Sequence, residues 1–503
     1  MTLLWLITVL LAGGALSWLL GSSLLGSPLL SSSLLGRANT RLPRWIALAT
    51  LLLAGGMLVE IWHGGPLPGR SWYAEVALPW IPRFGIGLQL GLDGLSLLMV
   101  ALTVVLGIVA VLASGDEIKH RHGFYHFNVL WMVAGVIGVF TAFDLFLFYF
   151  FWEVMLIPAY LLIAVWGAEQ RQRAAMQFFV FTQSSGLLML LSFLVLVYAH
   201  HAVTGVVTFN YFALLGTQFA PALAQWAMVG LVIAFLVKLP GVPFHTWLPD
   251  AYTQAPTGGS ILLAGIMSKT GAYGLLRFVV PMFPEASRTL HWPMMLLGAL
   301  GVVYGGMLAF AQSDVKRLVA YSSLSHMGFV LLGIFAWNEL ALQGAVLQMV
   351  AHGVSIAALF VIVGVLAQRV GSREVRRMSG VWAAAPKLGA MGLIVLVATL
   401  GMPGFGNFVA EFMVLLGTFK VSVAVVVVAG AGLVLAALYA LSLMQRAFQG
   451  PPGNTVIADI GVAQSALLLS LIGALVYLGV HPQPVFDLWA PTLSELSARV
   501  PGL

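Results

Sequence analysis

The sequence predicts an all-α, polytopic membrane protein built as a single domain of about fourteen transmembrane helices. Composition is the first reason. Of the 503 residues, 60% are hydrophobic and only 8% are charged, whereas a soluble domain has roughly 25% charged residues. The mean hydropathy is +1.00. The second reason is that apolar runs recur along the whole chain, each long enough for the roughly 20 residues that a helix needs to cross a bilayer.

These apolar runs define the predicted helices in order. The first run lacks the basic start of a secretory signal, so we interpret it as an uncleaved helix. After the second run, residues 63–93 contain the alternating pattern FGIGLQLGL and predict an external loop with a short hairpin. The predicted spans lie near 2–20, 43–62, 93–113, 124–142, 144–166, 175–199, 222–252 (interrupted), 256–281, 291–311, 317–336, 339–366, 384–419 (interrupted), 421–446 and 462–480.

Basic residues in the loops orient the predicted bundle. Odd-numbered loops hold fifteen lysines and arginines, whereas the even-numbered loops and the C-terminal tail hold five. Cytoplasmic loops are enriched in these residues, so we expect both termini on the outer, periplasmic side. This distribution explains the net charge of +6, which therefore does not indicate a nucleic-acid partner.

Two interrupted spans suggest an internal repeat. KLPGVPF, with Pro240, breaks the seventh span, and GMPGFGNF, with Pro403 and Gly404, breaks the twelfth. Proline lacks an N–H group and disrupts helices. A spacing of five spans reverses the topology of the second copy, as in inverted-repeat transporters. We predict five-helix repeats over about 124–281 and 291–446, although two unrelated proline kinks would give the same pattern.

Six ionisable residues on six predicted helices are expected near the middle of the membrane. Placing a lysine or glutamate there costs at least about 2.5–3.5 kcal/mol, so such residues are functional by default. A lone buried histidine, by contrast, is as often structural. The candidate proton-transfer residues are Glu153, Lys238, Lys269, His326, His352 and Glu411, and the supporting candidates are Asp144, His245, Pro240, Pro403 and Gly404.

Such a row of residues can move protons. Burial favours the neutral forms of lysine and glutamate, whereas an opposite charge nearby favours their charged forms, so movement of one group changes the proton affinity of the next. Histidine is suited to pass protons between these groups. Asp144 lies near the outer end of its span, where it could also serve only as a helix cap.

Motifs for other chemistry are absent from the sequence. The chain has no cysteine, which excludes disulfides and cysteine-bound iron–sulfur clusters or haem. It contains no phosphate-binding loop, no dinucleotide fingerprint in a βαβ unit and no HExxH motif. We therefore expect no metal and no cofactor in this chain, and any electron transfer would take place in a partner.

Five segments carry a specific family resemblance within residues 84–450. They resemble the antiporter-like M-chain family of NADH-quinone oxidoreductase, respiratory complex I. In that family the twelfth helix has glutamate, as at Glu411, whereas the related L and N chains and the Mrp-type antiporters usually have lysine. Gln177 departs from the pattern, because many relatives have lysine there. The segments are FYFFWEVMLIPAYLLIAVWG (148–167), KLPGVPFHTWLPDAYTQAPTGGSILLAGIMSKTGAYGLLRF (238–278), FAQSDVKRLVAYSSLSHMGFVLLG (310–333), QMVAHGVSIAALF (348–360) and GMPGFGNFVAEFM (401–413).

The resemblance implies a role for each position. Glu153 would pair with Lys238, Lys269 would be the central lysine, and Glu411 would be the outward exit, with the two histidines in between. It also implies a subunit of a proton-translocating NADH:quinone oxidoreductase in the cell inner membrane. Chains of the L and N types would lie on either side, and partner subunits would hold FMN, iron–sulfur clusters and quinone.

Two alternatives from other classes remain at the level of sequence. A free-standing Mrp-type cation/proton antiporter subunit would transport ions without redox partners. A structural spacer in a membrane complex would tolerate the loss of Lys238, which the cost of burying that charge disfavours. The proteins that copurify with the chain in mild detergent would distinguish these readings.

Overall fold

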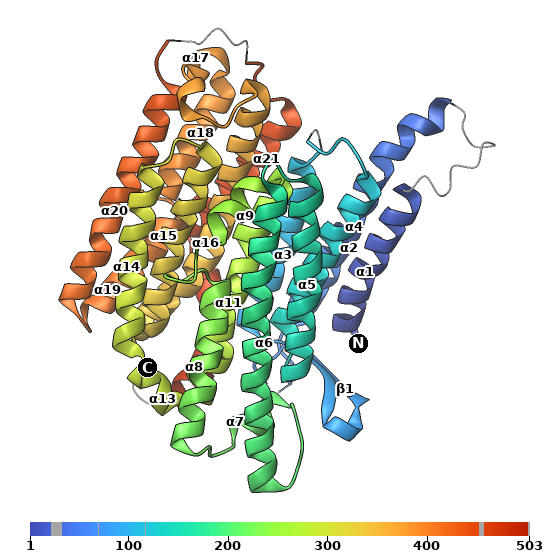
Figure 1. Cartoon of the computed structure of the whole chain (residues 1–503), viewed down its shortest axis with the longest axis vertical. Coiled ribbons are helices and arrows are strands. Elements are labelled where there is room, and N and C mark those ends of the chain that lie inside the picture. Colours follow the sequence, from blue (N-terminus) through green and yellow to red (C-terminus); the bar gives the residue numbers. More distant parts are fainter. Residues whose placement is uncertain (22–32, 69, 116, 452–456, 501–503) are drawn as a thin grey trace.

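The computed structural model describes residues 1–21, 33–68, 70–115, 117–451 and 457–500, with the backbone alone for 33–40. Long helices lie side by side along one direction (Figure 1). The N-terminal part contains α1 (Thr2–Gly21), α2 (Ser33–His63), β1 (Ala74–Ile81), β2 (Ile86–Leu92), α3 (Gly94–Ala113), α4 (His122–Thr141), α5 (Leu145–Trp166), α6 (Arg171–Thr204), α7 (Tyr211–Leu215), α8 (Pro221–Lys238) and α9 (Leu248–Gln254).

The eighth predicted span is helical but is divided by two π-helical segments. It consists of α10 (Thr257–Leu262), η3 (Leu263–Met267), α11 (Ser268–Gly274), η4 (Leu275–Val279) and α12 (Val280–Met282). The remaining helices are α13 (Pro284–Thr289), α14 (His291–Phe310), α15 (Val315–Phe335), α16 (Glu339–Val370), α17 (Val381–Ala384), α18 (Pro386–Thr399), α19 (Gly406–Phe419), α20 (Val423–Leu443), the π-helical η6 (Met444–Phe448), α21 (Val462–Val480) and α22 (Gln483–Arg499).

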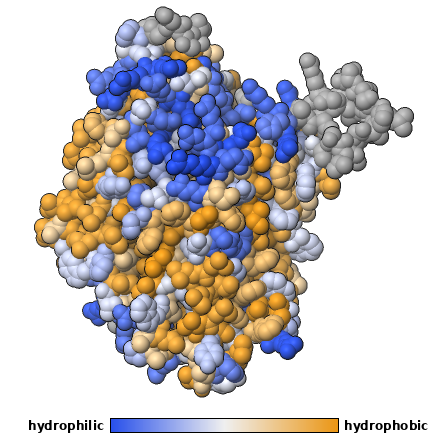
Figure 2. Space-filling view, in the orientation of Figure 1, coloured by the Kyte–Doolittle hydropathy of each residue, from blue (hydrophilic) through white to orange (hydrophobic). Residues whose placement is uncertain are grey.

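The all-α membrane fold is confirmed. Among the described residues, 12 helices are long and apolar enough to cross a membrane. The other two predicted spans correspond to the segmented 257–282 and to the shorter apolar helices α18 and α19. The total of fourteen crossings, the single domain and the inverted repeats remain predictions. Figure 2 shows a largely apolar surface over the middle and lower parts, as expected for contact with lipid, and a hydrophilic region near the upper end.

The predicted hairpin is present and is tied to the bundle. β1 and β2 pair in antiparallel register from Ala74 opposite Leu92 to Ile81 opposite Ile86, with an irregularity next to Pro79. The Gly87 N–H of β2 donates to Asp144 Oδ2 at 2.9 Å. Both chain ends lie in the half of the molecule that contains β1 (Figure 1).

Both predicted helix breaks are present. In the first, α8 ends at Lys238 and α9 begins at Leu248, and Pro240 has a φ of 29°. The Trp247 indole N–H donates to the Val237 carbonyl at 2.9 Å and holds this break against the helix. In the second, α18 ends at Thr399 and α19 begins at Gly406.

Glycines allow the helices that carry the candidate residues to approach closely. A Cβ at Gly271 of α11 would lie 2.5 Å from the Phe235 carbonyl oxygen of α8. A Cβ at Gly344 of α16 would lie 2.7 Å from the Ala410 carbonyl oxygen of α19. Small residues permit such backbone contact in membrane helix packing. These contacts bring the helix of Lys269 against that of Lys238, and the helix of His352 against that of Glu411.

Candidate functional site

Lys269 and His352 are in direct contact inside the bundle. Lys269 lies on α11 and His352 on α16, and both residues are 0% exposed. Lys269 Nζ is 2.7 Å from His352 Nδ1 and donates to the Ala264 carbonyl at 2.6 Å. Ala264 belongs to the π-helical segment η3, and such segments are frequent at functional sites. An ammonium group can only donate, so Nδ1 is the acceptor when the lysine is charged.

His326 and Glu411 form a second direct contact. His326 Nδ1 on α15 is 2.7 Å from Glu411 Oε1 on α19, and both side chains are only 2% exposed. The amide nitrogen of Gln348, on α16, donates to the same carboxylate oxygen at 3.0 Å. Glu411 is the sixth residue of α19, so these two side chains, rather than the N–H groups of the first turn, are its hydrogen-bond partners.

The two contacts adjoin through the histidine rings. The ring centroids of His326 and His352 are 5.5 Å apart, with the rings tilted by 51°. Within the described part of the chain, His352 Nε2 and Glu411 Oε2 are buried and have no hydrogen-bond partner. The structure therefore brings Lys269, His352, His326 and Glu411 together in this order, with one gap between the rings.

Glu153 and Lys238 are arranged differently. Lys238 is 0% exposed, and among the described residues its Nζ has no hydrogen-bond partner and forms no ion pair within 4.0 Å. The Nζ lies over the rings of Trp152 and Phe178, at 4.9 and 5.9 Å from their centroids. Glu153 Oε1 lies against Gly186 of α6. Glu153 and Lys238 are therefore not in direct ion-pair contact.

The supporting candidates have mainly structural surroundings. Asp144 caps α5, because its Oδ1 accepts from the N–H groups of Phe146 and Leu147 at 3.0 Å. His245 lies in the first break with its ring 5.2 Å from that of Tyr304, and no described residue hydrogen-bonds its buried Nδ1. Pro403 and Gly404 form the second break, where Gly404 has a φ of 101° that favours glycine.

Several neighbours of the row were missed by the sequence reasoning. Gln348 precedes His352 by four residues, so both lie on one face of α16, and this spacing could have identified it. Tyr439 of α20 contacts His326 Nε2 through its hydroxyl group at 3.3 Å, but a single tyrosine in an apolar run gives no signal. Gln177 donates to the Thr246 carbonyl at 3.1 Å and so supports the first break.

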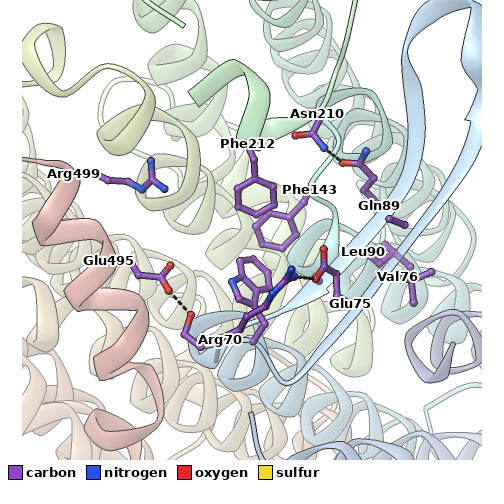
Figure 3. A pocket seen from close by; sticks show the side chains of 14 residues that line it. Arg70, Glu75, Val76, Gln89, Leu90, Phe143, Asn210, Phe212, Glu495 and Arg499 are labelled. Atoms are coloured by element: carbon purple, nitrogen blue, oxygen red, sulfur yellow. Dashed lines mark hydrogen bonds and ion pairs between the residues drawn. The ribbon is translucent and has the colours of Figure 1, made fainter. Parts of the chain in front are cut away.

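A surface cavity of about 450 Å³ lies away from this row, beside the hairpin. Figure 3 shows Phe143 and Phe212 side by side in it, and Glu495 of α22 accepting a hydrogen bond from Ser71. None of the candidate site residues lines this cavity. In the part of the chain that the structure describes, no group of three or more His, Asp or Glu side chains could hold a metal ion.

The helical bundle, its two broken spans and the buried row define an antiporter-like membrane subunit. The family model described as "NADH:quinone oxidoreductase/Mrp antiporter, TM" matches residues 142–437, more than half of the chain. The chain therefore belongs to the NADH:quinone oxidoreductase/Mrp antiporter family.

Within this family, the chain is similar to M subunits over nearly its whole length. NADH-quinone oxidoreductase subunit M of Pseudomonas aeruginosa is 48% identical over 507 residues, covering 98% of this chain and 97% of the relative. The corresponding Escherichia coli K12 subunit is 47% identical over 502 residues, covering 97% and 96%.

Solved structures agree with this assignment. A chain of respiratory complex I from Thermus thermophilus with bound NADH has a TM-score of 0.87 at 29% identity, covering 99% of this chain and 100% of that chain. A chain of the Mrp complex from Dietzia sp. DQ12-45-1b has a TM-score of 0.82 at 22% identity, covering 100% of this chain and 52% of that chain, and shows the shared fold.

Proposed function

We propose that this subunit carries protons across the membrane through the row Glu153, Lys238, Lys269, His352, His326 and Glu411, in which all residues except the half-buried Glu153 are buried. The observation that supports it best is the pair of 2.7 Å contacts, Lys269 with His352 and His326 with Glu411, on four buried side chains. Each contact joins groups that can exchange a proton. Buried ionisable residues of this kind mark proton pathways in membrane proteins.

Quinone reduction in partner subunits would drive this transfer. The M subunits similar to this chain are named as parts of NADH-quinone oxidoreductase, so we place this chain in the membrane arm of a proton-translocating NADH:quinone oxidoreductase, next to subunits of the L and N types. FMN, iron–sulfur clusters and quinone would be held by partners. For the clusters, this chain has no cysteine ligand. The complex would lie in the cell inner membrane, with both termini of this subunit on the periplasmic side.

The charge bias of the loops supports a direction for the transfer. Cytoplasmic loops are enriched in basic residues, so the end that carries 371–385 would lie in the cytoplasm and the hairpin end would face outward. Asp144 and His245 would support the first half of the row, while the breaks at Pro240 and at Pro403–Gly404 would provide free backbone groups and local hinges. Glu411 would release protons to the outer side.

A free-standing Mrp-type cation/proton antiporter subunit is the second candidate. The likeness to the Mrp complex supports the fold of this alternative. A tag on this chain and mild detergent would distinguish the two functions. The proposal predicts copurification with NADH-oxidising subunits, and inverted membrane vesicles that take up protons when NADH is added. Isolation of the chain without redox subunits, together with sodium-driven proton movement in vesicles, would establish the alternative instead.

A further inference from the structure

His326 faces a different partner with each of its ring nitrogens. Nδ1 is 2.7 Å from Glu411 Oε1, and Nε2 is 3.3 Å from the Tyr439 hydroxyl group of α20. Tyr439 is 2% exposed and His326 is 2% exposed. Resting on the function proposed above, we propose that Tyr439 is a further proton-transfer residue, which supplies His326 from the side opposite Glu411.

The hydrogen-bond donors around Glu411 determine where the protons lie. Oε1 accepts from the Gln348 amide nitrogen, and when the Glu411 carboxylate is ionised, His326 Nδ1 is the donor in their 2.7 Å contact. In a neutral imidazole the other nitrogen is then an acceptor. The Tyr439 hydroxyl group is therefore the donor to Nε2, and it holds the ring in the tautomer that points a proton at Glu411.

Ser322 of α15 lies beside Tyr439 and is 0% exposed. Its hydroxyl group donates to the Val319 carbonyl at 2.8 Å. Ser322 is seven residues from Val315, the first residue of α15, which corresponds to about 10 Å along a helix. The Val315 N–H donates to the Arg373 carbonyl at 2.9 Å, so this end of α15 adjoins the loop after α16.

A proton supply from this end would be separate from the Lys269–His352 contact. Tyr439 lies about 14 Å from Phe448, the last residue of η6, and the Gly380 N–H donates to the Gln449 carbonyl next to it. The route from Ser322 and Tyr439 therefore leads toward the end of the molecule that carries α17, opposite β1 in Figure 1. His326 becomes a junction between two proton sources.

The proton balance of this branch is simple. When Nδ1 gives its proton to Glu411, the Tyr439 hydroxyl group gives its proton to Nε2. The Ser322 hydroxyl group, which donates to the Val319 carbonyl in the structure, would turn and give its proton to the tyrosine oxygen, and water from the α17 end would reprotonate Ser322. A reorientation of the His326 ring that turns its protonated nitrogen toward Glu411 restores the starting arrangement. One proton is thus moved to Glu411 for each proton taken from water.

The test uses the assembled complex in inverted membrane vesicles and measures protons taken up per NADH oxidised. Tyr439→Phe removes only the hydroxyl group and should lower this ratio severalfold. Ser322→Ala should lower it less, and the double variant should be no worse than Tyr439→Phe, because both act in one chain. The matched control is Tyr125→Phe, since Tyr125 is also 0% exposed and bonds a serine, Ser114, at 2.6 Å outside the row. It should leave the ratio unchanged.

Two results would overturn the role of Tyr439. One is a wild-type ratio of protons to NADH in Tyr439→Phe, together with a Glu411→Gln variant that no longer pumps. This pair of results would refute the role of Tyr439 and leave the proposed function of the row intact. The other is a loss in Tyr439→Phe that adds to an independent loss in Ser322→Ala, because additivity would indicate separate structural effects. Wild-type ratios in both Tyr439→Phe and Glu411→Gln would refute the proposed function together with this branch.

Discussion

The two halves of the buried row contain similar residue types but connect them in different ways. In the second half, Lys269, His352, His326 and Glu411 are linked by two contacts of 2.7 Å and by adjacent histidine rings. In the first half, Lys238 lies among aromatic rings, with no ion pair to Glu153 within 4.0 Å among the described residues.

The difference indicates two modes of coupling. A cation–π contact contributes about 0.5–2 kcal/mol, which is less than the several kcal/mol lost when a charge leaves water. The aromatic rings alone therefore do not offset the burial of a charged Lys238. In the second half, the side chains are in direct contact within each pair, and only the gap between the histidine rings separates the pairs. We infer that the first half responds to charge and the second half to hydrogen-bond geometry.

The largest effect is expected when the charge of the first half is removed. Lys238→Ala leaves the half-buried Glu153 without its positive neighbour, so the carboxyl group should keep its proton. NADH-driven proton uptake and coupled quinone reduction should both be lost in an assembled complex. Lys420→Ala, which removes an exposed lysine next to α19, is the control. Normal uptake with Lys238→Ala would show that the first half needs no charge at this position.

Shortening each glutamate by one methylene separates the two modes. Glu411→Asp should break the 2.7 Å contact with His326 and retain only part of the uptake. Glu153→Asp keeps a carboxylate near Lys238 and breaks no such contact, so it should retain most of the uptake. The measurement is the proton to NADH ratio in both variants, normalised to assembled complex. A larger loss of proton uptake in Glu153→Asp than in Glu411→Asp would show that the first half, rather than the second, depends on a precise side-chain contact.

A smaller effect is expected from the second helix break. Gly404 has a φ of 101°, and a Cβ there would meet no atom within 4 Å, so alanine adds backbone strain without a clash. The strain is about 1–3 kcal/mol, and uptake should fall while every titrating group stays in place. Gly430→Ala in α20 is the control, because its Cβ would also meet nothing and its φ is not positive. Equal proton uptake by the two variants would show that the break serves only helix packing.

The smallest effect is expected from Asp459, which binds the N-terminal end of α18 in the second broken span. Burial raises the pKa of Asp459, but the backbone N–H groups of Lys387, Leu388 and Ile460 outweigh it and hold the pKa below its usual value. The N–H groups of Lys387 and Leu388 lie in the first turn of α18. Asp459→Ala should therefore cost about 1 kcal/mol of stability at neutral pH, as for a lost helix cap.

The sign of the pH dependence follows from the lowered pKa. The contribution of Asp459 is complete above the usual aspartate value of about 3.9 and is lost as the pH falls through the lower folded value. Thermal unfolding of the detergent-solubilised complex should show a difference between wild type and Asp459→Ala that shrinks below about pH 4. Asp487→Ala, which loses only one bond from Gln483, is the control. A difference that grows in acid would contradict this account.

Much of the fold could be predicted from the sequence, because hydrophobic length and Pro-Gly interruptions act locally. The helices, the hairpin and the breaks after Lys238 and Thr399 follow from such patterns. The segmentation of 257–282 by π-helical turns could not be predicted, because no local sequence pattern marks it. The C-terminal helix α22 was missed, since its sequence is too polar for a span.

The site was predictable in its charged members and less so in their contacts. Buried lysines and glutamates stand out in an apolar chain, whereas Gln348 and Tyr439 contribute only through neighbours on other helices. The sequence also suggested a pair between Glu153 and Lys238, but it could not show that aromatic rings would surround the lysine. These side-chain contacts depend on the distances between helices, which the sequence alone does not give.

Proton uptake by the Glu411→Gln variant tests the central claim most directly. Glutamine keeps the size of the side chain and an oxygen that can accept from His326, but it cannot take up and release a proton. In inverted vesicles driven by NADH, and normalised to assembled complex, the row predicts loss of proton uptake by this variant. Uptake equal to that of the wild type would contradict the account, because protons would then leave the membrane without passing Glu411.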